Sequence, residues 1–178
     1  MSNHATPGTV IIPARRLLIY LPVGFSNNIH SGRAGLRETA GEIWECTETA
    51  VMAITTSGSV TPDGRAIFGR GVARQAAKLF PDLAEKLGRL LTEKGNHVFD
   101  LGHGIVSFPV EETAWSQPDL RIIARSAEEL RQLADRYGWD QIVVPRPGCG
   151  GGGLAWKDVQ PLLAPWFDGR FTVISQRP

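Results

Sequence analysis

From about Glu42 onward, short apolar runs alternate along the chain with segments of helical periodicity. Short apolar runs bounded by turn residues are typical of buried strands. They predict strands at Val51–Thr55, Gly104–Phe108, Gln141–Pro145 and Phe171–Ser175, with shorter candidates at Glu42–Glu45 and near His97–Asp100. The alternation indicates an α/β fold, in which each strand leads through a loop into a helix that covers the sheet.

The helical segments are marked by their apolar spacing and their end residues. One helix is predicted from Val72 to about Phe80 and another from about Trp156 to Trp166, where Pro161 can distort it. Between them, Asp82 is placed to cap a helix that stops at Gly95. That helix has an apolar face made of Leu83, Leu87, Leu90 and Leu91.

The segment after Trp115 fits two interpretations. Residues 120–124 are apolar enough for a short strand, followed by a helix capped by Ser126 with Glu129 completing a capping box. We favour one long helix that starts near Ser116 and Pro118. Helical spacing continues throughout the segment at Ile123, Ala127, Leu130, Ala134 and Tyr137.

Residues 1–36 differ from the rest, since Asn, Ser, Gly and His are frequent there. Their apolar patch, Leu17 to Phe25, is interrupted by Pro22 and is shorter than the about 20 apolar residues that span a bilayer. We therefore expect no membrane partner. The sequence predicts an N-terminal extension over 1–36, for which an edge strand and an unstructured leader both stay open, and a single domain over 37–178.

Two glycine-rich loops each follow a predicted strand and open a predicted helix. The first is Phe68-Gly-Arg-Gly-Val72 and the second is Gly148-Cys-Gly-Gly-Gly-Gly153. Glycine lacks a Cβ atom, so the backbone N–H groups of such loops can approach an anion closely. The helix dipole behind each loop favours the same negative charge. The pair of loops indicates a ligand with two phosphates.

Composition and charge exclude several classes of partner. A formal net charge of +1 predicts no nucleic-acid partner and no anionic membrane, which require a clustered basic surface. Two cysteines make no disulfide framework, and a reducing, cytoplasmic setting is the simplest inference. The four histidines show no zinc-binding spacing, so we predict no metal and no cofactor.

The second loop invites two other interpretations, which we reject. Its G-x-G-x-x-G spacing suggests a dinucleotide-binding fold, but Asp168 precedes the last predicted strand instead of ending the next one. Cys149 suggests a phosphatase nucleophile, but the arginine expected six residues later is Ala155. A small thiol buried in a packed loop explains Cys149 equally well.

Four segments, in order, resemble the macro domain family: Gly41-Glu-Ile-Trp44, Ile54-Thr-Thr-Ser-Gly-Ser59, Gly64-Arg-Ala-Ile-Phe-Gly-Arg-Gly-Val-Ala73 and Pro145-Arg-Pro-Gly-Cys-Gly150. Phe108-Pro109 and the ending from Trp156 to Phe171 resemble a bacterial and phage subgroup. The resemblance covers roughly residues 37 to 178. It implies a three-layer α/β/α fold with a mixed central sheet that binds ADP-ribose, and some members of the family also hydrolyse ADP-ribosyl bonds.

The resemblance also implies roles for single residues. Glu42 takes the place of an aspartate that accepts a hydrogen bond from the adenine amino group, and Ser57 takes the place of an asparagine that contacts the distal ribose. The first loop is expected to hold the phosphate nearer the adenosine, and the second loop the other phosphate. The expected ligand contacts are Glu42, Ile43, Ser57, Phe68, Gly69, Arg70, Gly71, Val72, Gly148, Cys149, Gly150, Gly151, Gly152 and Gly153.

The chain departs from the members that resemble terminal ADP-ribose glycohydrolases. Glu111 falls about where their lysine lies, and Gly152 about where their aspartate lies. Neither residue can replace the missing chemistry, since a carboxylate forms no covalent ribose adduct of the amine type and glycine has no side chain. The remaining acid–base candidates are Asp63, in a Pro-Asp-Gly turn, and His103, between two glycines.

The sequence thus favours a domain that binds free ADP-ribose, or ADP-ribose attached to a substrate, through the same contacts. One alternative is a hydrolase that removes ADP-ribose from a macromolecule or phosphate from ADP-ribose 1''-phosphate. Another is a protein-interaction module without a nucleotide. Whether the chain is an enzyme stays open at this point.

Overall fold

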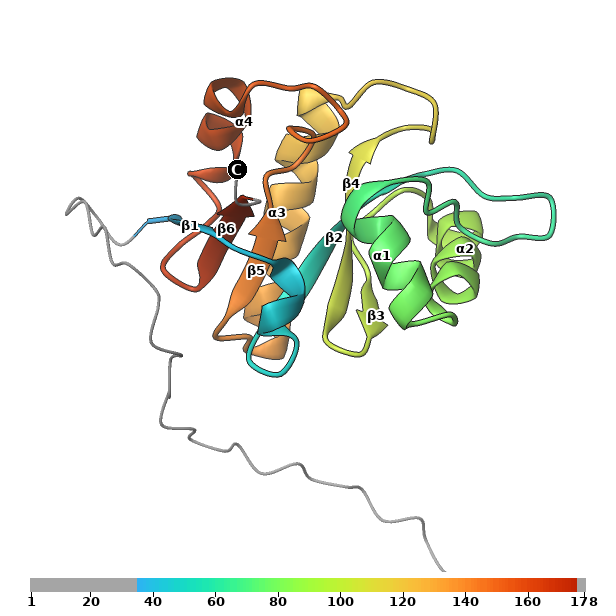
Figure 1. Cartoon of the computed structure of the whole chain (residues 1–178), viewed down its shortest axis with the longest axis horizontal. Helices are drawn as coiled ribbons and strands as arrows, with labels where there is room; N and C mark the ends of the chain where they lie inside the picture. The colour runs from blue at the N-terminus through green and yellow to red at the C-terminus, as the bar shows by residue number, and fades with distance from the viewer. Residues whose placement is uncertain (1–34, 176–178) are drawn as a thin grey trace, which may run out of the picture. The chain divides into compact units, whose positions relative to one another are not determined.

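The computed structural model describes residues 35–175, which contain one six-stranded sheet (Figure 1). The strand order is β1-β6-β5-β2-β4-β3. All neighbouring strands are parallel except the edge pair β3 and β4, so the sheet is mixed. The strands are β1 (Arg37–Ala40), β2 (Val51–Ser57), β3 (Asp100–Gly102), β4 (Ile105–Glu111), β5 (Ile142–Pro145) and β6 (Phe171–Ser175).

Helices cover both faces of this sheet. One face packs on the 3₁₀ helix η1 (Ile43–Cys46), α1 (Gly71–Leu79) and α2 (Leu83–Lys94) through a core cluster that includes Ile43, Ala76 and Leu87. The other face packs on α3 (Leu120–Tyr137) and α4 (Trp156–Leu163). The result is the three-layer α/β/α arrangement that the sequence resemblance implied. No helix within residues 35–175 combines the length and the apolarity needed to cross a membrane.

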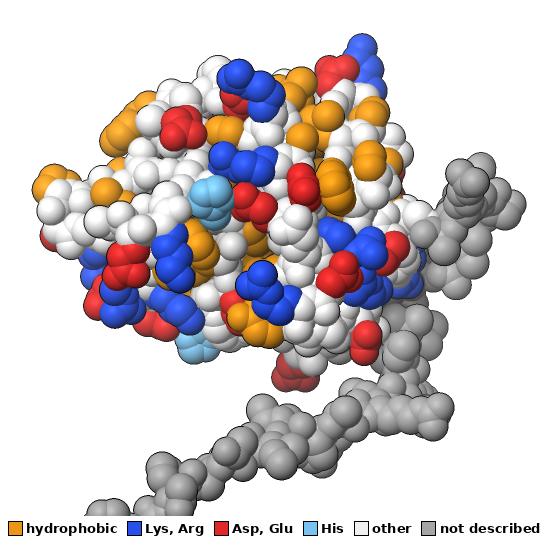
Figure 2. Space-filling view, turned by 180° about the vertical axis from the view of Figure 1, so that it is seen from behind, with side chains coloured by type: hydrophobic (Ala, Val, Ile, Leu, Met, Phe, Trp, Pro, Cys, Tyr) orange, Lys and Arg blue, Asp and Glu red, His pale blue; other side chains and the backbone are white. Residues whose placement is uncertain are grey.

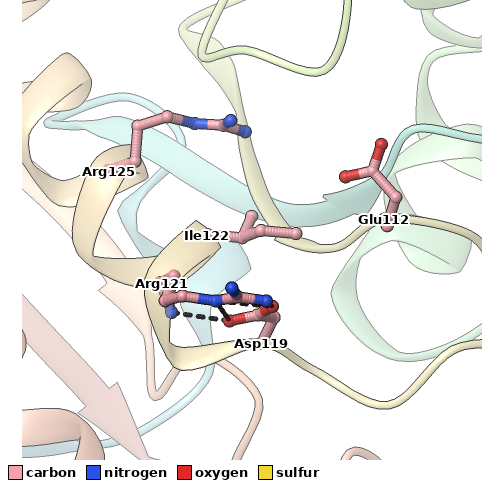
Figure 3. A pocket seen from close by; sticks show the side chains of 5 residues that line it. All are labelled: Glu112, Asp119, Arg121, Ile122 and Arg125. Atoms are coloured by element: carbon pink, nitrogen blue, oxygen red, sulfur yellow. Dashed lines mark hydrogen bonds and ion pairs between the residues drawn. The ribbon is translucent and has the colours of Figure 1, made fainter.

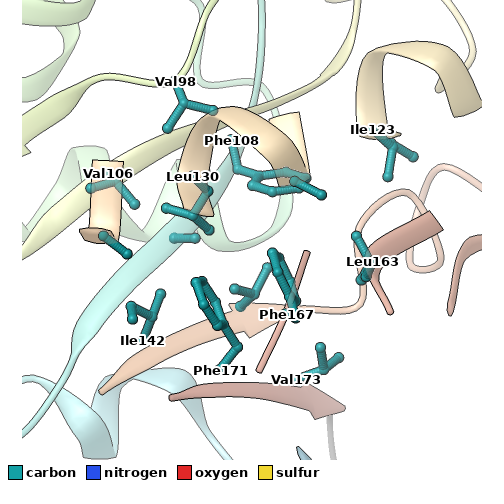
Figure 4. Packing of buried hydrophobic residues seen from close by; sticks show 14 of the residues in the cluster. Val98, Val106, Phe108, Ile123, Leu130, Ile142, Leu163, Phe167, Phe171 and Val173 are labelled. Atoms are coloured by element: carbon teal, nitrogen blue, oxygen red, sulfur yellow. The ribbon is translucent and has the colours of Figure 1, made fainter. Parts of the chain in front are cut away.

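The central strands consist mainly of apolar residues because both of their faces are buried. In β2, Ala53 belongs to the cluster beneath α3 and α4, whereas Met52 and Ile54 belong to the cluster beneath α1 and α2. The cluster beneath α3 and α4 centres on aromatic rings (Figure 4), and the ring centroids of Phe167 and Phe171 lie 4.4 Å apart. The two clusters hold the helices against both faces of the sheet, and the glycine loops project from this rigid sheet.

The four main predicted strands are confirmed as β2, β4, β5 and β6, and the short candidate near His97–Asp100 corresponds to β3. The predicted strand at Glu42–Glu45 is wrong, because this segment forms η1. The first strand among the described residues is instead β1, a mostly exposed edge strand of sequence Arg-Glu-Thr-Ala. Its lack of an apolar pattern explains why the sequence did not reveal it.

The long helix after Trp115 is confirmed as α3, although it begins at Leu120 and not near Ser116. Its N-cap is Asp119, whose carboxylate accepts a hydrogen bond from the Arg121 backbone N–H at 2.8 Å. Ser126, the alternative N-cap, lies in the middle of α3 and is buried. Its hydroxyl donates to the carbonyl oxygen of Pro109 at 2.8 Å. The last helix, α4, ends at Leu163 instead of Trp166.

Helix α2 supports the segment that leads into the first glycine loop. Gly88 lets residues 64–66 cross the helix closely, since a Cβ atom there would overlap the Gly64 carbonyl oxygen. The Ala66 backbone N–H also donates to the Ala84 carbonyl at 2.7 Å. Asp82 occupies the predicted N-cap position, but its side chain makes no capping hydrogen bond. Its carboxylate contacts His103 instead.

The predicted division into an extension over 1–36 and a domain over 37–178 stays a prediction. Residues 1–34, including the apolar patch Leu17 to Phe25, lie outside the described residues. Of the predicted extension, Gly35 and Leu36 are described: Gly35 forms an isolated β-bridge with Asp168, and Leu36 packs against the core beneath α3 and α4.

Candidate functional site

The two glycine loops lie at the same edge of the sheet. Strands β2, β4 and β5 are parallel, so their carboxyl ends meet at one edge, the upper edge in Figure 1. The first loop follows β2 and leads into α1, and the second follows β5 and leads into α4. Because β2 and β5 are direct neighbours, loops far apart in the sequence come together here. The carboxyl edge of parallel strands is where α/β proteins bind their ligands.

The first loop ends at a helix start whose N-cap side chain makes no capping hydrogen bond. Arg70 is the N-cap of α1 with extended backbone angles, and its side chain makes no capping hydrogen bond. Arginine is not among the residues that satisfy helix N-termini, which are Ser, Thr, Asp and Asn. Gly71 has a φ of 56°, a conformation that favours glycine. The first N–H groups of α1 are thus available to an external acceptor.

The second loop has two glycines that the fold requires. Gly148 has a φ of 71°, and a Cβ atom there would lie 2.7 Å from the Leu154 side chain. A Cβ atom at Gly152 would lie 2.6 Å from the Gly148 carbonyl oxygen. By contrast, a Cβ atom at Gly150 would meet no atom within 4 Å. Helix α4 starts after Ala155, again without a side-chain cap.

Arg70 connects the two loops. Its guanidinium Nη2 lies 2.7 Å from Oε2 of Glu111, the last residue of β4. A Cβ atom at Gly151 would lie 3.4 Å from Arg70 Cδ, so the arginine also borders the second loop. Ser57, at the end of β2, pairs with Glu111 in the strand register. Its hydroxyl is buried without a hydrogen-bond partner among the described residues.

A small pocket of about 30 Å³ lies beside the first loop. It brings together the expected adenine contacts Glu42 and Ile43 with Val72 from the first turn of α1. Ile43 is buried, whereas Glu42 is exposed at the start of η1. The pocket is lined by Gly41, Glu42, Ile43, Val72, Gln75, Pro145 and Ile174.

The sequence matches no family model and no curated protein. The fold, however, is similar to solved structures. The macrodomain of Mycobacterium tuberculosis DarG has a TM-score of 0.66 and 20% sequence identity, covering 80% of this chain and 97% of that chain. The macrodomain of Thermus aquaticus DarG has a TM-score of 0.63 and 21% identity, covering 80% and 98%. The chain has a macrodomain fold.

A third similar structure is Thermosipho africanus DarTG in complex with ADP-ribose. Its TM-score is 0.62 at 18% identity, and the match covers 79% of this chain and 41% of that chain. The resemblance of the sequence to macro domains is therefore confirmed at the level of the fold. At these identities the likeness does not by itself assign a ligand to this chain.

Cys149 shows no sign of a reactive thiol. Burial raises the pKa of its thiol, and the opposing effect of Arg146 is smaller. The Sγ atom lies 3.4 Å from the Pro147 carbonyl oxygen, within its own loop. A thiol with a raised pKa holds little thiolate at neutral pH, which argues against a nucleophilic role.

The second loop is braced from outside by charged and aromatic side chains. Arg146 and the indole N–H of Trp156 both contact the Glu38 carboxylate of β1, at 3.2 Å and 3.0 Å. The Arg146 guanidinium also lies 4.9 Å from the centre of the Trp156 ring. These contacts tie the start of the loop and the start of α4 to an edge strand, which holds the loop in place.

The two acid–base candidates lie in turns. His103 precedes β4, at the opposite edge of the sheet from the glycine loops, and has a φ of 55°. Its ring stacks on Phe80 and its Nε2 lies 3.1 Å from the Asp82 carboxylate. Asp63 is exposed, and the Thr61 hydroxyl of its own turn is the main cause of its lowered pKa. The structure thus does not bring His103 to the two loops.

Phe68 packs partly into the core beneath α1 and α2. The remaining expected contacts of the first loop, Gly69, Arg70 and Gly71, are exposed. The structure therefore brings Glu42, Ile43 and Val72 together in the pocket, and places Arg70 between the two glycine loops. Glu111 also lies at this corner and pairs with Arg70, a contact that spans 41 positions in the sequence and that sequence reasoning did not predict.

A separate hollow of about 450 Å³ lies between the end of β4 and the start of α3 (Figure 3). Both of its arginines and Asp119 are already engaged within the protein. Arg121 binds the Asp119 carboxylate at 2.7 Å, and Arg125 donates to the Asn96 carbonyl oxygen at 2.6 Å. We therefore assign it no ligand. It is lined by Glu112, Asp119, Arg121, Ile122 and Arg125.

The face of the molecule seen in Figure 2 carries acidic and basic side chains interspersed, without a broad patch of one sign. Such a mixture provides no concentrated positive field. The absence of a nucleic-acid partner stays a prediction.

Proposed function

We propose that this macrodomain binds ADP-ribose or a close derivative, free or attached to a macromolecule, across the two glycine loops. The observation that carries the proposal is the pair of uncapped helix starts, α1 and α4, which follow glycine loops at one edge of the sheet. Each provides backbone N–H groups and a favourable dipole for a phosphate. The ADP-ribose complex of the similar Thermosipho africanus structure supports the same choice of ligand.

In this proposal the adenine enters the pocket beside η1. Glu42 accepts a hydrogen bond from the adenine amino group, and the Ile43 backbone N–H donates to the ring. The pocket of about 30 Å³ must widen for this purpose. Its rim residues Glu42 and Gln75 are exposed side chains, which can move at low cost. Gln75 is held at present by a hydrogen bond from the Trp44 indole at 2.8 Å.

The phosphates occupy the two loops. Residues 69–72 hold the phosphate nearer the adenosine, and residues 148–153 hold the other phosphate and border the distal ribose near Ser57. Backbone N–H groups suit a diphosphate because they donate several hydrogen bonds without burying a fixed charge.

We infer binding in preference to hydrolysis. The resemblance places Glu111 and Gly152 where terminal ADP-ribose glycohydrolases have a lysine and an aspartate. Glu111 is engaged by Arg70 at 2.7 Å, and Gly152 has no room for a side chain. An enzyme on this scaffold would need another group to activate water.

Substituting Gly150 with valine tests the proposal. The folded loop has space for this side chain, but the added methyl groups cover the backbone N–H groups that a phosphate would approach. Gly150→Val is expected to weaken ADP-ribose binding by about tenfold or more, a loss of about 1.4 kcal/mol, and to leave the melting temperature nearly unchanged.

Gly169→Val is the matched control, since a Cβ atom at Gly169 also meets nothing within 4 Å and the residue precedes β6 at the opposite edge of the sheet. It should bind ADP-ribose like the parent in calorimetric titration. If Gly150→Val folds and binds as tightly as the parent, the second loop does not hold a phosphate.

A further inference from the structure

Glu111 is a buried carboxylate at the ligand edge of the sheet. Its side chain is 10% exposed, whereas that of its partner Arg70 is 53% exposed. A buried charge is costly unless it is paired, so Glu111 depends on Arg70. Arg70 depends less on Glu111, because its guanidinium is half in solvent. The arginine is therefore the member of the pair that can leave.

The guanidinium of Arg70 could also pair with an anion bound at the glycine loops. It stands at the N-terminus of α1, and its side chain borders Gly151 of the second loop. A guanidinium binds phosphate oxygens through paired hydrogen bonds. A diphosphate lying across the two loops would compete with Glu111 for the same guanidinium.

Ser57 gives an independent indication that this corner receives a ligand. It is 4% exposed, and its hydroxyl has no hydrogen-bond partner among the described residues. Buried hydroxyls nearly always form a hydrogen bond, so the unpartnered hydroxyl of Ser57, next to Glu111 in the strand register, calls for a hydrogen-bond partner. A serine hydroxyl and a carboxylate together match the hydroxyl groups of a sugar, which can donate to both.

We propose that a diphosphate draws Arg70 away from Glu111, and that the freed carboxylate, together with Ser57, binds the hydroxyls of the sugar on the distal phosphate. This inference rests on the proposed function and narrows its substrate class. The site takes a nucleoside diphosphate that carries an uncharged sugar with free hydroxyls. A further phosphate on that sugar would face the Glu111 carboxylate and be repelled.

The test compares ADP with ADP-ribose by calorimetric titration into the parent and Glu111→Gln. Glutamine keeps the shape of Glu111 but no longer holds the guanidinium by charge. We expect Glu111→Gln to bind ADP about threefold to tenfold more tightly, because Arg70 is free for the phosphates. ADP-ribose should gain less, because its sugar loses the carboxylate. The ratio of the two affinities should therefore fall at least about threefold.

Two further variants complete the design. The double variant Arg70→Gln/Glu111→Gln leaves no unpaired buried charge, and it should bind ADP more weakly than Glu111→Gln. Arg74→Gln, at an exposed arginine one turn further along α1, should leave the ratio of affinities unchanged. Thermal melting of each variant confirms that it folds.

The outcomes separate this inference from the function on which it rests. If the parent binds ADP-ribose but Glu111→Gln changes neither the ADP affinity nor the ratio, the exchange of Arg70 is wrong and the proposed function stands. Equal ADP binding by the double variant and Glu111→Gln would also overturn the exchange. If the parent binds no ADP-ribose, both proposals fail.

Discussion

Gly150 and Gly152 are two positions apart in one loop, yet their surroundings differ. A Cβ atom at Gly152 would lie 2.6 Å from a backbone carbonyl oxygen, so the fold itself requires glycine there. At Gly150 the space is open. Packing therefore does not explain the glycine at 150, whereas the proposed access of a phosphate to the backbone would explain it.

Glu42 is the residue on which adenine recognition depends in this account. Glu42→Ala removes the acceptor of the adenine amino group and should weaken ADP-ribose binding about threefold to tenfold, since the net contribution of a typical hydrogen bond is about 0.5 to 1.5 kcal/mol. Ribose 5-phosphate binding should not change. Glu42 is exposed, so the melting temperature should stay the same.

Glu48→Ala is the control for charge, because Glu48 is also exposed and follows η1. Calorimetric titration of both variants makes the comparison. Equal ADP-ribose affinity in Glu42→Ala and Glu48→Ala would place the adenine elsewhere.

Among the elements, helix α3 offers a test of how its N-terminus is held. The Arg121 side chain is the main cause that lowers the pKa of Asp119 to about 2, from an ordinary value of 3.8. A carboxyl group whose pKa is lower in the folded than in the unfolded state stabilises the fold fully at pH values above its unfolded pKa. This stabilisation is lost as the pH falls through its folded pKa.

Asp119→Asn keeps an acceptor at the N-cap but removes the charge. The variant should melt at a lower temperature than the parent at pH 7, and this difference should shrink below about pH 4 and nearly vanish near pH 2. Thermal melts across this range measure it. A difference that stays constant with pH would show that the ion pair with Arg121 contributes nothing to stability.

The elements also show what sequence can and cannot predict. Strands β2, β4, β5 and β6 were predictable because burial of the sheet demands apolar runs. Strand β1 is an exposed edge strand of polar residues, and η1 carries Ile43 and Trp44 in a pattern that mimics a strand. The start of α3 was misplaced because Ser116 and Asp119 are both acceptable helix starts.

The candidate site follows the same division. Both glycine loops were visible in the sequence, because glycine composition and strand–loop–helix order are local properties. The contact of Arg70 with Glu111 was not, since it joins the ends of two different elements 41 positions apart. Only the adjacency of β2 and β4, with a register that pairs Ser57 with Glu111, brings these side chains together.

At the scale of the whole molecule, the account requires one ligand to span two loops. The loops belong to separate strand–helix units, and they meet because β2 and β5 are parallel neighbours. A ligand that fills only one loop would gain only part of the binding free energy. Affinity that depends on both halves of ADP-ribose is thus the property that distinguishes this arrangement from a single phosphate site.

The most direct test is a calorimetric titration of the protein with ADP-ribose, with AMP and ribose 5-phosphate as the two half-ligands, at near-physiological salt. The account predicts a dissociation constant near 1 μM for ADP-ribose, about −8 kcal/mol, and at least tenfold weaker binding of either half. No heat with ADP-ribose, or equal affinity for AMP, would contradict the claim that the two glycine loops form one binding site.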